Sequence, residues 1–172
     1  MELQGKKVVI PVESMFNTFE FWYPYYRLKE AGAAVTVVGS GSAETYTGKP
    51  GTEVKVDASI EQVSAVDFDG IVIPGGYAPD IMRRYPRMVQ LVKDLFEDGR
   101  VVAAICHAGW MLASAKILAG KKVTSFFAIK DDLVHAGAEW VDQEVVVDGN
   151  LVTSRTPDDL PAFMRAVIAA MK

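Results

Sequence analysis

The chain is poor in residues that bind metals or form cross-links. Its 172 residues include one cysteine and two histidines. A single cysteine cannot form an internal disulfide, and these three residues show no metal-ligand spacing, so we expect neither a metal site nor a cofactor. Lysines and arginines form no stripe and the formal net charge is −4. These features argue against a nucleic-acid partner.

Long apolar runs are also missing. The N-terminal residues lack the apolar core of a signal peptide, and no run approaches the length that crosses a bilayer. We therefore expect no membrane partner and a cytoplasmic location.

Hydrophobic residues make up 50% of the chain. A chain of this length and composition is expected to bury one core and form a single domain, residues 1–172.

Short apolar runs alternate with segments of helical spacing. The sequence predicts strands at 6–12, 33–38, 70–74 and 101–105 and helices at 19–31, 79–98, 109–118 and 156–171. This alternation predicts an α/β fold with a mostly parallel sheet covered on both faces. Asp148-Gly149-Asn150, between Val145-Val-Val147 and Leu151-Val-Thr153, predicts a hairpin turn.

The only cysteine stands where an apolar strand is expected to turn into a helix. Five apolar residues precede Cys106, and small residues Ala108 and Gly109 follow it after His107. This order is typical of a nucleophile elbow. A lone intracellular cysteine is most often a small buried hydrophobe. Its place at a strand end and before a helix, whose positive end stabilises a thiolate, favours a reactive cysteine instead.

Two other segments end a predicted strand with unusual chemistry. One strand leads to Asn17 and Glu20, and another leads to Gly75 and Gly76. Ligands of parallel sheets bind outside the carboxyl ends of the strands, so these residues and Cys106 are expected on one rim. Gly75-Gly76 is a plain turn or a backbone N–H donor facing the reacting centre. Glu20 points to solvent or, if buried, has a raised pKa and donates a hydrogen bond to a thiolate.

The sequence leaves three roles open for His107. It is a general base, a surface histidine, or a residue whose backbone N–H contributes to an oxyanion hole. Because adjacent residues on an elbow diverge, contact between its ring and the sulfur is not assumed.

Several motifs together resemble the PfpI family, the intracellular-protease-like branch of the parkinsonism-associated deglycase superfamily. The resemblance spans nearly the whole chain and is carried by Ala104-Ile-Cys106-His107, Val72-Ile-Pro-Gly-Gly-Tyr-Ala-Pro-Asp80, Ile129-Lys-Asp-Asp132 and Glu144-Val-Val-Val-Asp-Gly-Asn-Leu-Val-Thr-Ser-Arg155. It implies a flavodoxin-like three-layer α/β/α sandwich, similar to class I glutamine amidotransferases, with a cysteine nucleophile elbow.

The resemblance also implies roles. Cys106 matches the nucleophile, and Glu20 matches the acid that hydrogen-bonds the thiolate. Gly76 and His107 match the oxyanion-hole positions, and His107 also matches the histidine of the Cys-His pair. Asp80 matches an acid that reaches the histidine of a neighbouring subunit. The implied assembly is a homo-oligomer, a dimer or a hexamer.

Three positions depart from the family pattern. Phe16-Asn17-Thr18 stands where many members have Phe-Glu-Asp, Phe126 where some have tyrosine, and Ala108-Gly109 where Gly-Pro is usual. Asn17, Phe126 and the nearby Trp110 are therefore expected to form a less acidic, more apolar pocket.

Three functions follow as hypotheses. The first is a cysteine-nucleophile enzyme on small carbonyl or acyl substrates, of the glyoxalase III or deglycase type or an intracellular peptidase. The second is a non-catalytic sensor whose cysteine is oxidised. The third is a specialised small-molecule hydratase or lyase, supported only by Asn17 and Phe126.

Overall fold

A seven-stranded sheet forms the centre of the computed structural model, which describes residues 1–172. The strand order is β10-β11-β7-β6-β1-β2-β5, and all neighbours are parallel except β10 and β11. The strands span β1 Lys7–Val12, β2 Ala34–Gly39, β5 Ala58–Ser59, β6 Gly70–Ile73, β7 Val101–Ile105, β10 Val145–Asp148 and β11 Leu151–Ser154. The central strands are buried apolar runs, as expected of a parallel sheet covered on both faces.

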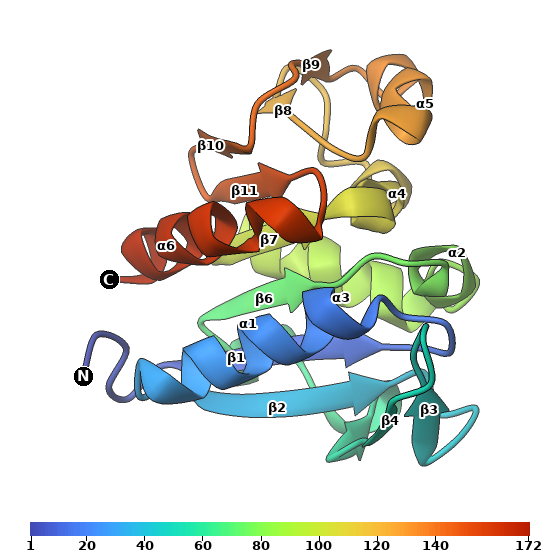
Figure 1. Ribbon diagram of the computed structural model, residues 1–172, viewed down its shortest axis with the longest axis vertical. Helices are drawn as coiled ribbons and strands as arrows, with labels where there is room; N and C mark the ends of the chain where they lie inside the picture. Colours follow the sequence, from blue (N-terminus) through green and yellow to red (C-terminus); the bar gives the residue numbers. More distant parts are fainter.

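Helices cover both faces of this sheet (Figure 1). On one face α1 and α6 contact each other, and α3 packs against β6 and β7 on the other. The helices are α1 Thr18–Glu30, α2 Ala78–Met82, α3 Pro86–Glu97, α4 Gly109–Ser114, α5 Lys130–His135 and α6 Leu160–Met171. This arrangement confirms the predicted α/β/α sandwich. None of the helices has the combined length and apolar character that crossing a membrane requires.

Two small sheets lie beside the main one. They pair β3 Thr45–Thr47 with β4 Glu53–Lys55, and β8 Lys122–Val123 with β9 Glu139–Trp140. The hairpin prediction is confirmed, since β10 and β11 pair antiparallel up to Asp148 and Leu151. Gly149 sits between them with φ 62°, a conformation that glycine adopts without strain.

The helix predicted over residues 79–98 is wrong, because the structure divides it. Helix α2 ends at Met82 and α3 begins at Pro86. A proline has no N–H to donate and disfavours helical backbone in the residue before it, so Pro86 starts a helix here. Helix α4 is also shorter than predicted. It ends at Ser114, and Lys116 has φ 59°, outside right-handed helix.

The predicted rim is confirmed by the strand order. Strands β1, β6 and β7 are parallel neighbours, so Val12, Ile73 and Ile105 end at the same edge of the sheet. The loops that follow them therefore emerge side by side.

Candidate active site

Cys106 follows β7 and takes a strained backbone conformation. Its φ is 61°, which a non-glycine residue rarely adopts. A 3-10 turn over Cys106–Ala108 then leads into α4. Only 7% of the residue is exposed. A Cβ on Gly109 would lie 3.0 Å from Leu133, so the space beside this turn favours glycine. The geometry is that of a nucleophile elbow.

Glu20 lies in the core and faces the same turn. It is 0% exposed, and its Oε2 accepts the Gly75 N–H at 2.8 Å. Its other oxygen, Oε1, is buried and has no hydrogen-bond partner. The sequence left Glu20 either exposed to solvent or buried, and the structure shows that it is buried.

Burial controls the protonation of both groups. It raises the pKa of the Glu20 carboxyl to about 7, against the opposing hydrogen bonds from Gly75 and Cys106. Burial, followed by the negative charge of Glu20, raises the pKa of the Cys106 thiol to about 12. The sequence predicted a thiolate stabilised by a helix N-terminus. Here α4 is short and the sulfur is buried, so the resting group is a thiol.

His107 touches the sulfur, a contact that the resemblance to a Cys-His pair implied and that the elbow pattern alone did not predict. Its Nδ1 lies 3.2 Å from the Cys106 Sγ. Burial lowers the pKa of His107, so the ring is neutral near pH 7 and can accept a proton. The ring stacks on Phe126 with centroids 4.9 Å apart, and Trp110 meets it edge-on at 5.2 Å. These two aromatic rings fix the orientation of the imidazole.

Two backbone N–H groups act on the Cys106 thiol. Those of His107 and Gly76 oppose the rise of its pKa. Gly76 has φ 80°, and its backbone pairs with Phe16 on the loop after β1. Donors that face the nucleophile in this way are suitably placed to hold an oxyanion formed beside it.

Asp80 does not join this cluster within one chain. It lies in α2, where its carboxylate pairs with Arg84. The Arg84 guanidinium holds the pKa of the Asp80 carboxyl below its usual range. Asp80 also lines a cavity of about 340 Å³ with Trp110 and His135. Asp80 and Arg84 stand four residues apart, the spacing at which side chains meet on a helix.

The remaining predicted pocket residue, Asn17, has a structural task. Its Oδ1 accepts the N–H groups of Phe19 and Glu20 and so caps α1. Its backbone N–H donates to the Gly75 carbonyl at 3.1 Å. Asn17 thus joins the α1 loop to the glycine loop. Elsewhere in the chain, no three His, Cys, Asp or Glu side chains converge as a metal site would require.

The fold and the site together define the class of this protein. It is an α/β protein of the flavodoxin-like type, with a cysteine elbow at the rim of the sheet and a buried glutamate beside the sulfur. The sequence pattern of the DJ-1/PfpI family matches residues 6–170. The chain belongs to this family.

Three relatives illustrate the similarity. Deglycase PH1704 of Pyrococcus horikoshii is 46% identical over 96% of this chain and 99% of its own. Deglycase PfpI of Pyrococcus furiosus is 43% identical with the same coverage. A two-domain protein of Anabaena variabilis with DJ-1/ThiJ/PfpI-like and ferritin-like domains superposes with a TM-score of 0.93 at 44% identity. That match covers 95% of this chain and 47% of the other.

Replacing Glu20 by glutamine is expected to change how stability depends on pH. The folded state binds the Glu20 proton more tightly than the unfolded state, whose carboxyl has the ordinary pKa of 4.5. Wild-type stability should therefore fall as pH rises from about 4.5 to 7, by about 3 kcal/mol. Urea unfolding at pH 5 and pH 8 measures this difference, which should shrink in Glu20→Gln.

The exposed Glu139 provides the matched control, because Glu139→Gln should keep the wild-type pH dependence. An equal pH dependence in Glu20→Gln and wild type would contradict the raised pKa of Glu20.

Proposed function

We propose that this chain is a cysteine-nucleophile enzyme acting on small electrophilic carbonyl or acyl substrates. The observation that carries the proposal is the 3.2 Å contact between the Cys106 Sγ and the His107 Nδ1. Pairing a nucleophile with an adjacent base is how enzymes activate a thiol that is protonated at rest. The deglycase names of the relatives are consistent with carbonyl chemistry at such a cysteine.

The first step is addition of sulfur to the carbonyl carbon. His107 accepts the thiol proton as the C–S bond forms, and the carbonyl π electrons move to oxygen. The N–H groups of Gly76 and His107 hold that oxygen. Glu20, when protonated, donates a hydrogen bond and carries no charge that would oppose the thiolate. When His107 returns its proton to that oxygen, the product is a hemithioacetal from an aldehyde, or a tetrahedral adduct from an acyl group.

Methylglyoxal is the simplest substrate that completes a cycle without a cofactor. A base takes the aldehyde C–H proton of its hemithioacetal, and the neighbouring ketone carbon takes up a proton. The hydroxyl proton moves to the former ketone oxygen, leaving a lactoyl thioester. Water hydrolyses this thioester to lactate and the free thiol. With His107 as the proton carrier, the net reaction is methylglyoxal plus water giving lactate.

A substrate panel tests the proposal. Purified wild-type protein is incubated with methylglyoxal, with the methylglyoxal adduct of N-acetylcysteine, and with a fluorogenic peptide. Lactate, released thiol and fluorescence are then measured. We expect turnover of methylglyoxal or its adduct. Turnover of none of the three would contradict the proposal, and cleavage of the peptide alone would favour the intracellular-peptidase alternative.

Oxidation sensing is the second candidate, favoured by one observation. The Glu20 carboxyl neighbours the Cys106 thiol, and its buried Oε1 has no hydrogen-bond partner, so the carboxyl is free to accept a hydrogen bond from a sulfur-bound oxygen acid. Peroxide would convert the thiol to a sulfenic acid with release of water. Selective Cys106 oxidation by mass spectrometry, with no turnover in the panel, would favour this function. The hydratase or lyase hypothesis has lost part of its support, since the Asn17 amide oxygen is used as a helix cap.

The proposal includes a homo-oligomer in which Asp80 of one subunit meets His107 of another. Within one chain, Asp80 bonds Arg84 and the His107 ring bonds only the sulfur. Helix α1 presents an aromatic surface, with Phe19 and Tyr26 exposed at 63% and 62%. Such a surface suits contact with a second copy.

Mixing two inactive variants tests this shared site. Cys106→Ser lacks the nucleophile and Asp80→Asn lacks the acid, so each alone should be at least tenfold less active than wild type. When the two are unfolded and refolded together, mixed oligomers should regain activity, because one kind of site then contains both groups. Light scattering reports the assembly, and a mixture no more active than its components would contradict a shared site.

A further inference from the structure

A buried carboxylate beside the candidate site has no part in the mechanism above. Glu13, directly after β1, is 3% exposed. Its Oε2 accepts the Ser14 N–H at 2.8 Å, and its Oε1 accepts the hydroxyls of Ser40 and Ser42. A carboxylate so buried is stabilised only if its oxygens are hydrogen-bonded, and these three donors meet that need.

The Tyr46 hydroxyl completes this set of hydrogen bonds. Its hydroxyl accepts the Ala43 N–H at 3.1 Å and lies 3.2 Å from both serine hydroxyls. Since the carboxylate only accepts, the serines donate to Glu13 and the tyrosine is left to donate to a serine. The Glu13 network, defined as Glu13, Ser14, Ser40, Ser42 and Tyr46, is thus oriented toward the carboxylate.

The network anchors the loop that supports Gly76. Next to Ser14, Met15 has φ 65° and its carbonyl accepts the Tyr77 N–H at 3.0 Å. The following residue, Phe16, forms a β-bridge with Gly76. The approach is close, because a Cβ on Gly76 would lie 2.5 Å from the Met15 oxygen. A shift of this loop therefore moves Gly76.

We propose that Glu13 is a positioning residue that holds the loop of residues 14–17 in its left-handed turn. It thereby keeps the Gly75-Gly76 loop against the cysteine, where a Cβ on Gly75 would lie 2.8 Å from the Cys106 Cβ. The inference deepens the proposed function and rests on it for the role of Gly76 in catalysis. Glu13 touches no reacting atom. Its carboxylate holds the Ser14 N–H. The backbone of Met15 and Phe16, next along the chain, then contacts the Gly76–Tyr77 segment.

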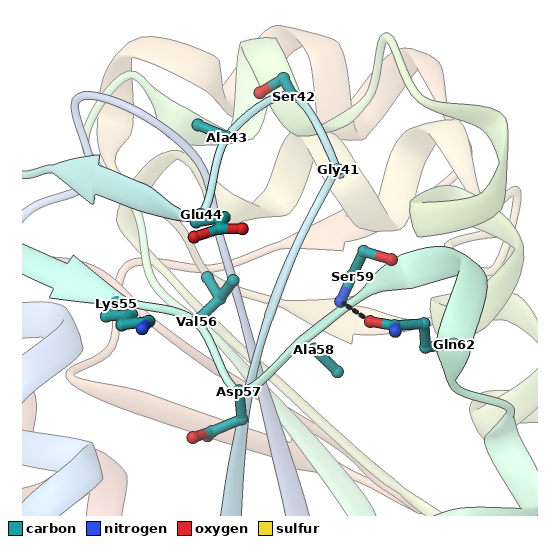
Figure 2. A pocket seen from close by; sticks show the side chains of 10 residues that line it. All are labelled: Gly41, Ser42, Ala43, Glu44, Lys55, Val56, Asp57, Ala58, Ser59 and Gln62. Atoms are coloured by element: carbon teal, nitrogen blue, oxygen red, sulfur yellow. Dashed lines mark hydrogen bonds between the residues drawn. The ribbon is translucent and has the colours of Figure 1, made fainter.

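A matched control lies on a neighbouring loop. Ser42 reaches the network from the wall of a separate cavity of about 550 Å³, which Figure 2 shows from close by. Glu44 lines the same cavity, two residues along the chain. It is exposed, and its side chain makes no hydrogen bond to the loop of residues 14–17. Glu44→Gln therefore removes a nearby carboxylate without touching the network.

The rate at which iodoacetamide alkylates Cys106 at pH 8 tests the inference without any substrate. This rate follows the thiolate fraction, and the Gly76 N–H is one of the groups that lower the pKa of the thiol. In Glu13→Gln the rate should fall about tenfold, which corresponds to a rise of one unit in the thiol pKa. Loosening of the fold alone would expose the sulfur and raise the rate. Glu44→Gln should react like wild type.

Steady-state kinetics with methylglyoxal provide a second measurement. Glu13→Gln should lower kcat about tenfold and change KM less than twofold, because the oxyanion donor acts in the transition state. If Glu13→Gln does not fold, Tyr46→Phe removes one donor of the network and should slow alkylation in the same direction. An unchanged or faster alkylation rate in the variant that folds would overturn the inference. Failure of wild type to consume methylglyoxal would count against the proposed function alone.

Discussion

Cys106→Ser is expected to lower kcat/KM for methylglyoxal by at least about a thousandfold. The hydroxyl of a serine has a higher pKa than a thiol and is a weaker nucleophile, so the neutral His107 cannot activate it equally well. Cys106→Ala should lose as much, since it removes the attacking atom altogether. The chain has no other cysteine, so no second thiol can replace it.

The control for this variant lies on the helix that follows. Ser114→Ala removes a hydroxyl at the end of α4 and should leave activity unchanged. Circular dichroism and melting temperature establish that each variant is folded. A folded Cys106→Ser protein that keeps activity within tenfold of wild type would remove Cys106 from the chemistry.

Gly76→Ala is expected to lose both activity and stability. The residue has φ 80°, where an alanine costs roughly 1–2 kcal/mol. Its Cβ would also lie 2.5 Å from the Asn17 nitrogen and the Met15 oxygen, so backbone on both sides must move. We expect an unfolding free energy lower by about 3 kcal/mol or more and a kcat about a hundredfold lower, because the N–H would turn away from the sulfur.

Gly99 separates the two causes of this loss. It has φ 72°, yet nothing lies within 4 Å of a Cβ built there. Gly99→Ala should therefore cost only the conformational part of the stability and leave kcat unchanged. Urea unfolding and steady-state kinetics on the three proteins give the comparison. Equal effects of the two substitutions on stability and kcat would mean that close packing at Gly76 has no special role.

The fold was predictable because its signals are local and repeated. The buried runs at Gly70–Ile73 and Val101–Ile105 mark central strands, and the glycines after helices mark their ends. The shared rim of Val12, Ile73 and Ile105 followed from parallel strand order alone. The helix predicted over residues 79–98 runs through Pro86, whereas α3 begins there, since a proline has no N–H with which to continue a preceding helix.

The candidate site was predictable in its residues but not in its contacts. Cys106, Glu20 and Gly76 could be placed together by the rim, whereas the side-chain angles that bring His107 to the sulfur leave no mark on the sequence. The protonation of Cys106 depends on the depth at which the sulfur is buried and on the charge of Glu20, which are both properties of the packed structure. The burial of Glu13 has no sequence signal, because an acid after a strand usually faces solvent.

The most direct test of the central claim is a titration of activity against alkylation of the single cysteine. Wild-type protein is treated with increasing iodoacetamide, and each sample is divided between intact-mass analysis and a methylglyoxal assay. If Cys106 is the nucleophile, residual activity should fall in proportion to the alkylated fraction and reach zero at one adduct per chain. Activity that persists in fully alkylated protein would contradict the account.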